Sequence, residues 1–244
     1  MRFAAALLFL ACVSSTALAQ PPAEIGRAGD AYRAGRFQEA AELYDSAIKA
    51  GETSAPLFYN TGNAWFRGGD FGRAILNYER ALVLEPGHPE AQANLQVARD
   101  KARALQLTGS RLDQLLGRIQ PNHYTIAAAA ALWIALLALA VFSFRPRRSG
   151  ALVALGLVAV LVFAGAVAAL YRLETGDKGR SFAIVTSPKI EARLATADSA
   201  GSVLALPAGS EIAILSTRGD WSYAALPNGL RGWIPADSAE RVRL

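Results

Sequence analysis

The stretch FRPRRSG, Phe144–Gly150, lies between two long apolar runs and decides how the chain is arranged around it. The runs, Tyr124–Phe144 and Ala151–Tyr171, are uncharged and each about 21 residues long, enough to cross the roughly 30 Å hydrocarbon core of a membrane as a helix. The short connection forces two such helices to run antiparallel. We therefore predict that these two runs form a transmembrane hairpin.

The loop 145–150 predicts the orientation of that hairpin. Its three arginines, Arg145, Arg147 and Arg148, have no acidic neighbour, and loops of this kind remain on the cytoplasmic side of a membrane. Both segments that flank the hairpin are then expected on the opposite side. Neither span carries an ionisable residue, so the pair offers no group for a proton or ion path.

The N-terminus has the pattern of an export signal, which agrees with the side predicted by the loop charges. Arg2 precedes a short apolar stretch, and Ala17–Ala19 supplies the small residues that signal peptidase requires. Cleavage before Gln20 would make 1–19 a signal peptide. The alternative is a lipoprotein-type signal that ends at Cys12, which would then carry a lipid.

Composition excludes several other classes of protein. Of 244 residues, 52 % are hydrophobic, more than an ordinary soluble domain contains. The formal charge of +5 comes from basic residues spread along the chain rather than from a nucleic-acid-binding patch. One cysteine and two histidines form neither a disulfide framework nor a Cys/His metal site. Because no nucleophile or phosphate-loop motif is present either, we expect a protein that is not an enzyme and holds no cofactor.

The exported segment before the hairpin contains a repeat. GRFQEAAELYDSAI from Gly35 and GDFGRAILNYERAL from Gly69 align with a period of 34 residues, with glycine, aromatic and alanine positions in register. This pattern resembles the tetratricopeptide repeat, in which pairs of antiparallel helices stack into an array. The resemblance implies an all-α array over 20–107. Its units would be 21–54, 55–88 and a partial unit 89–107.

The same resemblance implies a binding groove on the inner surface of the stacked first helices. Aromatic side chains beside basic ones suit an extended or acidic peptide from a protein partner. For each single residue, the alternative is packing inside the repeat. By register, the residues expected to face the groove are Tyr32, Arg33, Tyr59, Asn63, Phe66, Arg67 and Lys101.

After the second span, short alternating segments are separated by turn signals such as PAGS, TRGD and LPNG. The segments SFAIV, SVLAL, EIAIL, WSYAAL and RGWIP predict a small all-β barrel over 181–244. The order LPAGSEIAIL, GDWSYAAL, NGLRGWIP resembles a bacterial SH3-like domain. Trp221, Tyr223 and Trp233 are the candidates for its ligand surface, with a place in the barrel core or rim as the alternative for Trp233.

The expected fold class is a multidomain membrane protein: an α-helical repeat array, a juxtamembrane linker over 108–123, a two-helix hairpin and an SH3-like barrel. This order is similar to the E-type (BatE) proteins of bacterial aerotolerance operons. The resemblance implies a scaffold in the inner membrane with both soluble domains on the periplasmic side. The implied partners are membrane proteins with von Willebrand A-type domains and, indirectly, a MoxR-type ATPase, in a complex that serves stress tolerance.

Two alternatives to the scaffold remain open at this point. The SH3-like barrel would suit an adaptor that binds the cell wall through peptidoglycan or its peptides. The repeat array would also suit an assembly factor for exported proteins.

Overall fold

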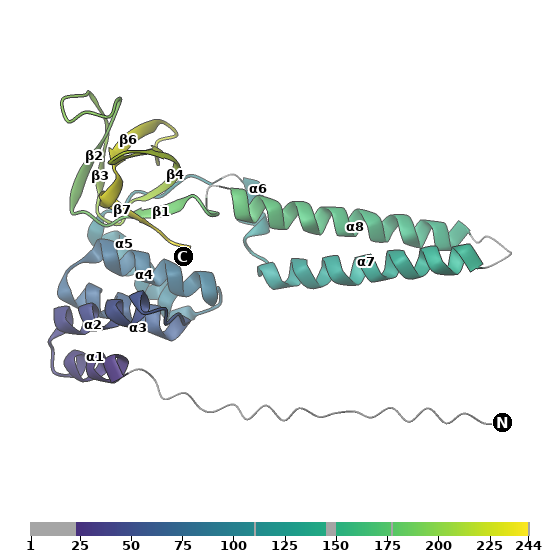
Figure 1. The fold of residues 1–244 in the computed structure, drawn as a ribbon, viewed down its shortest axis with the longest axis horizontal. Coiled ribbons are helices and arrows are strands. Elements are labelled where there is room, and N and C mark those ends of the chain that lie inside the picture. The colour runs from purple at the N-terminus through teal and green to yellow at the C-terminus, as the bar shows by residue number, and fades with distance from the viewer. Residues whose placement is uncertain (1–22, 110, 145–149, 177, 244) are drawn as a thin grey trace.

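The computed structural model describes residues 23–109, 111–144, 150–176 and 178–243 (Figure 1). The expected signal peptide with Cys12 and the three arginines of the loop lie outside these residues. Within the described ranges, the chain forms eight α-helices and a seven-stranded antiparallel sheet. Figure 1 shows three parts: a layer of short helices, the sheet beside it, and a pair of long helices that extends away from both.

Five helices form the N-terminal layer, and each packs against the next along the chain. They are α1 (Ala23–Arg33), α2 (Phe37–Lys49), α3 (Ala55–Gly68), α4 (Phe71–Leu84) and α5 (Pro89–Ala102). Ala40 and Ala74, at matching positions of the two repeat copies, are fully buried. Gly62 faces the ring of Tyr78 so closely that a Cβ would lie 2.7 Å from it. The close approach of these helices therefore depends on small residues at defined positions.

Local sequence signals set where two of these helices begin and end. The Ser54 hydroxyl accepts a hydrogen bond from the backbone N–H of Leu57, and the Asp70 carboxylate accepts one from that of Arg73. Gly69, which follows α3, has a φ of +87°, a conformation that glycine adopts without strain. The turn from α3 into α4 therefore follows from the residues that form it.

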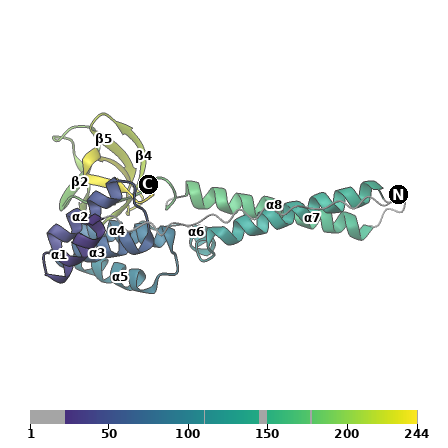
Figure 2. The same ribbon diagram turned by 60° about the horizontal axis from the view of Figure 1, so that its bottom comes forward.

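The two long helices, α7 (Pro121–Phe144) and α8 (Gly150–Thr175), pack against each other and point away from the rest of the molecule in both views (Figures 1 and 2). Both are long and apolar enough to cross a membrane, and many of their large side chains are exposed. Small residues are the buried ones along both helices, as in helix pairs that pack in lipid. These are Ala128, Ala131 and Ala138 of α7 and Ala159, Ala166 and Ala169 of α8.

The segment expected to be a linker contains a further short helix, α6 (Arg111–Leu116), which packs against α8. Asp113 of α6 accepts hydrogen bonds from the guanidinium of Arg172 over 2.9 and 3.2 Å. The Tyr124 hydroxyl donates to the carbonyl oxygen of Leu116 over 3.0 Å. These contacts tie the end of α8 and the start of α7 to the segment that precedes the hairpin.

The C-terminal part is one antiparallel sheet with the strand order β3-β2-β6-β5-β4-β1-β7. Its strands are β1 (Phe182–Val185), β2 (Lys189–Arg193), β3 (Ser202–Pro207), β4 (Glu211–Arg218), β5 (Trp221–Ala225), β6 (Arg231–Pro235) and β7 (Ala239–Arg241). Five of them coincide with the apolar segments found in the sequence. β2 and β7 were not expected, because their sequences KIEAR and AER are too polar to stand out as strands.

The helical layer and the sheet share one core. Ile75 of α4 belongs to the same buried cluster as Phe182 of β1 and Val242 near the C-terminus. Gly72 of α4 permits this approach, because a Cβ at that position would lie 3.1 Å from the carbonyl oxygen of Val185. No sequence pattern had indicated this contact between segments that lie on either side of the hairpin.

Candidate functional site

A cavity of about 290 Å³ lies between α1, α3 and α5. It is lined by Tyr32, Tyr59, Asn63, Phe66, Arg67, Asn94 and Val97. The first five of these were expected from the repeat register to face a groove. The structure therefore brings side chains of α1, α3 and α5 to one surface, which we call the groove.

Hydrogen bonds fix the polar side chains of the groove. Asn63 Oδ1 accepts from the Tyr78 hydroxyl over 2.8 Å and from Asn94 Nδ2 over 2.9 Å. Asn94 Nδ2 also donates to the Tyr59 hydroxyl over 3.3 Å. The described residues provide no further partner for Asn63 Nδ2, a donor, or for Asn94 Oδ1, an acceptor. A peptide unit offers one acceptor and one donor, so these two groups complement it.

Burial keeps Tyr78 in the protonation state that this network needs. Its side chain is fully buried, and burial raises the pKa of its hydroxyl far above the usual value. The hydroxyl therefore stays protonated and continues to donate to Asn63 across the ordinary pH range.

Side chains around the groove also pack within the helical layer. The Tyr59 ring lies 4.8 Å from that of His88, measured between centroids. The guanidinium of Arg67 lies 4.6 Å from the centroid of the Phe37 ring, yet Arg67 remains exposed. These contacts orient the side chains without covering the surface that they present to the cavity.

Two residues expected in the groove lie elsewhere. Arg33 pairs with Asp30 on the exposed side of α1 and does not line the groove. Lys101 lines a different cavity, of about 540 Å³, together with Thr186 and Pro207 from the sheet region. Arg67 is therefore the one basic residue among the described residues that line the groove.

Asn94 and Val97 line the groove although they were not anticipated. They lie 34 residues after Asn60 and Asn63, one repeat period further along the chain. The register was thus sufficient to find Val97, the equivalent of Asn63, but not Asn94, because its equivalent Asn60 does not line the groove. The signal was weak because α5 lacks the aromatic residues that mark the earlier units.

The aromatic residues of the sheet form a second cluster. Tyr223 of β5 lies opposite Trp233 of β6, with ring centroids 5.0 Å apart, and Trp221 lies opposite Pro235. All three aromatic residues are partly exposed, whereas Ser222 between them is buried. They therefore share the outer face of β5 and β6, where stacking supports the strand pair and the exposed edges offer a contact surface.

A buried ion cluster lies where the helical layer meets the sheet. Glu211 at the start of β4 is fully buried and accepts hydrogen bonds from Arg99 of α5 and, over 3.1 Å, from the backbone N–H of Leu107. Lys178 Nζ lies 3.0 Å from Glu211 Oε2. Arg99 also pairs with Glu79 of α4, whose pKa is raised by burial. The cluster joins α4, α5, the segment before β1 and the sheet through mutually neutralising charges.

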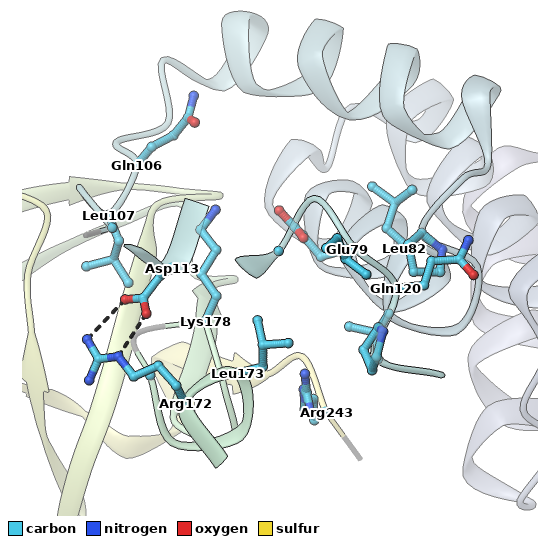
Figure 3. Close-up of a pocket in the computed structure, with 17 residues that line it drawn as sticks. Glu79, Leu82, Gln106, Leu107, Asp113, Gln120, Arg172, Leu173, Lys178 and Arg243 are labelled. Atoms are coloured by element: carbon cyan, nitrogen blue, oxygen red, sulfur yellow. Dashed lines mark hydrogen bonds and ion pairs between the residues drawn. The ribbon is translucent and has the colours of Figure 1, made fainter. Parts of the chain in front are cut away.

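A cavity of about 580 Å³, which we call the junction cavity, is lined in part by two members of this cluster, Glu79 and Lys178 (Figure 3). In Figure 3, Asp113 and Arg172 lie on the left of the cavity, and Glu79 of α4 lies on the right. No sequence pattern had indicated it, because its walls come from α4, α6, α7, α8 and the C-terminal segment.

Across the described ranges, no group of three His, Cys, Asp or Glu side chains lies close enough together to hold a metal ion. A comparison of the chain with protein-family models and with curated proteins found no match.

Proposed function

We propose that this chain is a membrane-anchored scaffold, without enzymatic activity, that binds a segment of a partner protein in the groove. One observation carries the proposal: five of the seven residues expected from the repeat register line a single cavity between α1, α3 and α5. That coincidence supports the interpretation of α1 to α5 as a short tetratricopeptide-type array, in which this surface holds peptides.

The proposed ligand is an extended segment with an acidic residue. The free amide donor of Asn63 and the free acceptor of Asn94 suit the polar atoms of a peptide backbone. Arg67 is exposed beside them and suits a carboxylate. Tyr32 and Phe66 provide apolar contacts on the same surface.

We further propose that α7 and α8 anchor the chain as a two-pass protein of a bacterial inner membrane. The helical layer precedes the hairpin and the sheet follows it, yet the two share a core. Both must then lie on the same side of any membrane that the hairpin crosses. Together with the expected export signal and arginine loop, this supports a periplasmic position for both.

The proposed partner follows from the order of the parts, which resembles the Bat-type proteins. In that order the sheet would be an SH3-like barrel packed on the array. The partner would be a membrane protein with a von Willebrand A-type domain, within an envelope complex linked to stress tolerance. A MoxR-type ATPase would be linked to the same complex indirectly.

Photocrosslinking in native membranes tests the groove. A photoreactive amino acid at Val97, which lines the groove and is exposed, should capture a von Willebrand A-type membrane protein. Arg67→Glu should reduce capture about tenfold, because a charge-assisted hydrogen bond is replaced by repulsion. Arg33→Glu makes the same charge change outside the groove and should leave capture unchanged. Equal capture by the photoreactive protein alone, with Arg67→Glu and with Arg33→Glu would exclude the groove as the binding site. Capture of many unfolded exported proteins would favour the assembly-factor alternative.

A second candidate function is the binding of peptidoglycan through the sheet. The partly exposed cluster of Trp221, Tyr223 and Trp233 favours it, because such rings stack on sugars and peptide groups. The full-length protein in detergent should then sediment with purified cell-wall sacculi, and Trp221→Ala should abolish this. Arg67→Glu should not affect sedimentation, so the two functions can be separated by the same pair of variants.

A further inference from the structure

The junction cavity lies where the two long helices meet the soluble parts. Pro121, the first residue of α7, and Leu173, in the last turn of α8, both line it. With α7 and α8 in the membrane as proposed above, these two residues lie near the membrane surface. The cavity is therefore within reach of the polar headgroups and the first carbons of the lipid chains.

Most of the lining is apolar, which suits an amphiphilic ligand better than a fully water-soluble one. The apolar lining residues are Leu82, Val83, Pro86, Leu107, Ile119, Pro121 and Leu173. The volume of about 580 Å³ is within the usual range of small-molecule sites. This is room for a headgroup and the adjoining part of a lipid, but not for whole acyl chains.

The charged residues of the lining leave one cation without a counter-ion. Four charged lining residues are paired: Glu79 with Arg99, Asp113 and Arg172 with each other, and Lys178 with Glu211. Arg243 forms no ion pair with any described residue, and its Nε is buried without a hydrogen-bond partner. Arg80 and Arg99 also have an unpaired Nε, but the Nη2 atom of each pairs with a carboxylate. A buried cationic donor without a partner favours an anionic group in the cavity.

The outer surface next to the cavity is suited to contact lipid. Leu112 and Leu115 of α6 and Ile119 after it are 55 %, 56 % and 47 % exposed. Leu112 and Leu115 belong to the helix that packs against α8, and the basic residues Arg111 and Arg118 lie beside these three apolar residues in the chain. Exposed apolar side chains flanked by arginines are typical of a segment that lies in the membrane interface.

We infer that the junction cavity binds one anionic phospholipid from the leaflet that faces the soluble parts. Its phosphate lies against Arg243, and its glycerol and first chain carbons lie against Leu107 and Leu173. This inference rests on the proposed membrane position of α7 and α8. It is independent of what binds the groove.

Native mass spectrometry of the full-length protein in mild detergent tests the inference, with phosphatidylglycerol or phosphatidylcholine added at equal concentration. The unaltered protein should retain one phosphatidylglycerol, with about tenfold preference over phosphatidylcholine, as one charge-assisted hydrogen bond provides. Arg243→Gln should reduce this preference to less than about twofold. Arg118, which follows α6, is exposed and does not line the cavity. Arg118→Gln also removes one positive charge, and this variant should keep the preference for phosphatidylglycerol.

A second variant tests the cavity itself rather than its charge. Val83→Trp adds bulk to the lining at a residue that is 42 % exposed, so it should fold and should prevent retention of both lipids. Glycerol phosphate should not displace the bound lipid, because it lacks the apolar part.

Three results would overturn the inference: equal retention of both lipids by the unaltered protein, equal losses in Arg118→Gln and Arg243→Gln, or displacement by glycerol phosphate. Extraction of the membranes with alkaline carbonate shows separately whether the chain is embedded in lipid. Failure of the membrane anchor is thereby distinguished from failure of the lipid site.

Discussion

The groove and the junction between the helical layer and the sheet are built in opposite ways. Groove residues come from helices that recur every 34 residues, so equivalent positions reach one surface. The ion cluster at the junction takes Glu79, Arg99, Lys178 and Glu211 from segments without a common pattern. The regular spacing of a repeat therefore places its surface residues predictably. The contact between the helical layer and the sheet instead depends on residues that only folding brings together.

The largest effect is expected from breaking the ion cluster. Glu211→Gln should lower the free energy of unfolding by about 3 kcal/mol, because it removes the fully buried carboxylate that pairs with Arg99 and Lys178 and leaves Arg99 with Glu79 alone. Urea unfolding of the full chain in detergent, followed by tryptophan fluorescence, measures this loss. Glu191→Gln, a partly exposed glutamate of β2, should change stability by less than about 0.5 kcal/mol. Equal losses in the two variants would mean that the cluster does not hold the junction.

A smaller effect is expected at Gly72, where α4 lies against the end of β1. Gly72→Ala gains helix propensity but places a Cβ 3.1 Å from the Val185 carbonyl oxygen and from Ala208 Cβ. Gly26→Ala in α1 gains the same propensity with no atom within 4 Å of the new Cβ. We expect Gly26→Ala to raise the free energy of unfolding by about 0.5–1 kcal/mol. The Gly72→Ala variant should be about 2 kcal/mol less stable than the Gly26→Ala variant, because overpacking is costly. The same urea series measures both, and equal stabilisation by the two changes would contradict a tight junction.

The groove offers a test of similar design. Tyr78→Phe removes the hydroxyl that donates to Asn63 and should cost about 1 kcal/mol, the usual value of one hydrogen bond. It should also weaken photocapture at Val97, because the Asn63 amide loses one of its two anchors. Tyr223→Phe, on the outer face of the sheet, should change stability by less than about 0.5 kcal/mol and leave capture unchanged. Full capture by Tyr78→Phe would show that the network does not orient the groove.

The smallest effect concerns Asp45, at the margin between α2 and the sheet, whose carboxylate accepts a hydrogen bond from Trp65 Nε1 over 3.2 Å. Burial raises the pKa of Asp45, and nearby Glu240 adds to the increase. Above this folded-state pKa the ionised carboxylate lowers stability. The penalty disappears as the pH falls through the folded-state pKa towards the unfolded-state value near 3.8.

Asp45→Asn keeps an acceptor oxygen for Trp65 but carries no charge. It should therefore raise the free energy of unfolding by about 0.5 kcal/mol at pH 7, and by less at pH 4. Urea unfolding at the two pH values measures the difference. An advantage of the variant that grows on acidification would contradict the assigned direction.

Much of the groove could be predicted from the sequence, and its exceptions have physical reasons. Tyr59, Asn63 and Phe66 line the cavity because repeat register fixes which face of a helix a residue occupies. Register does not fix where a long side chain ends, and Arg33 turns to pair with Asp30. In the sheet, the apolar strands were visible in the sequence, while β2 and β7 depend on cross-strand partners that a polar sequence does not reveal.

By itself, the sequence determined the two long apolar helices, the period of the helical layer and five strands, because each follows from the spacing of residues that are neighbours along the chain. Only the tertiary structure decided that Arg99 meets Glu211, 112 positions later, and that the junction cavity forms beside them. A buried charge requires a counter-charge in space, and its position in the sequence is free.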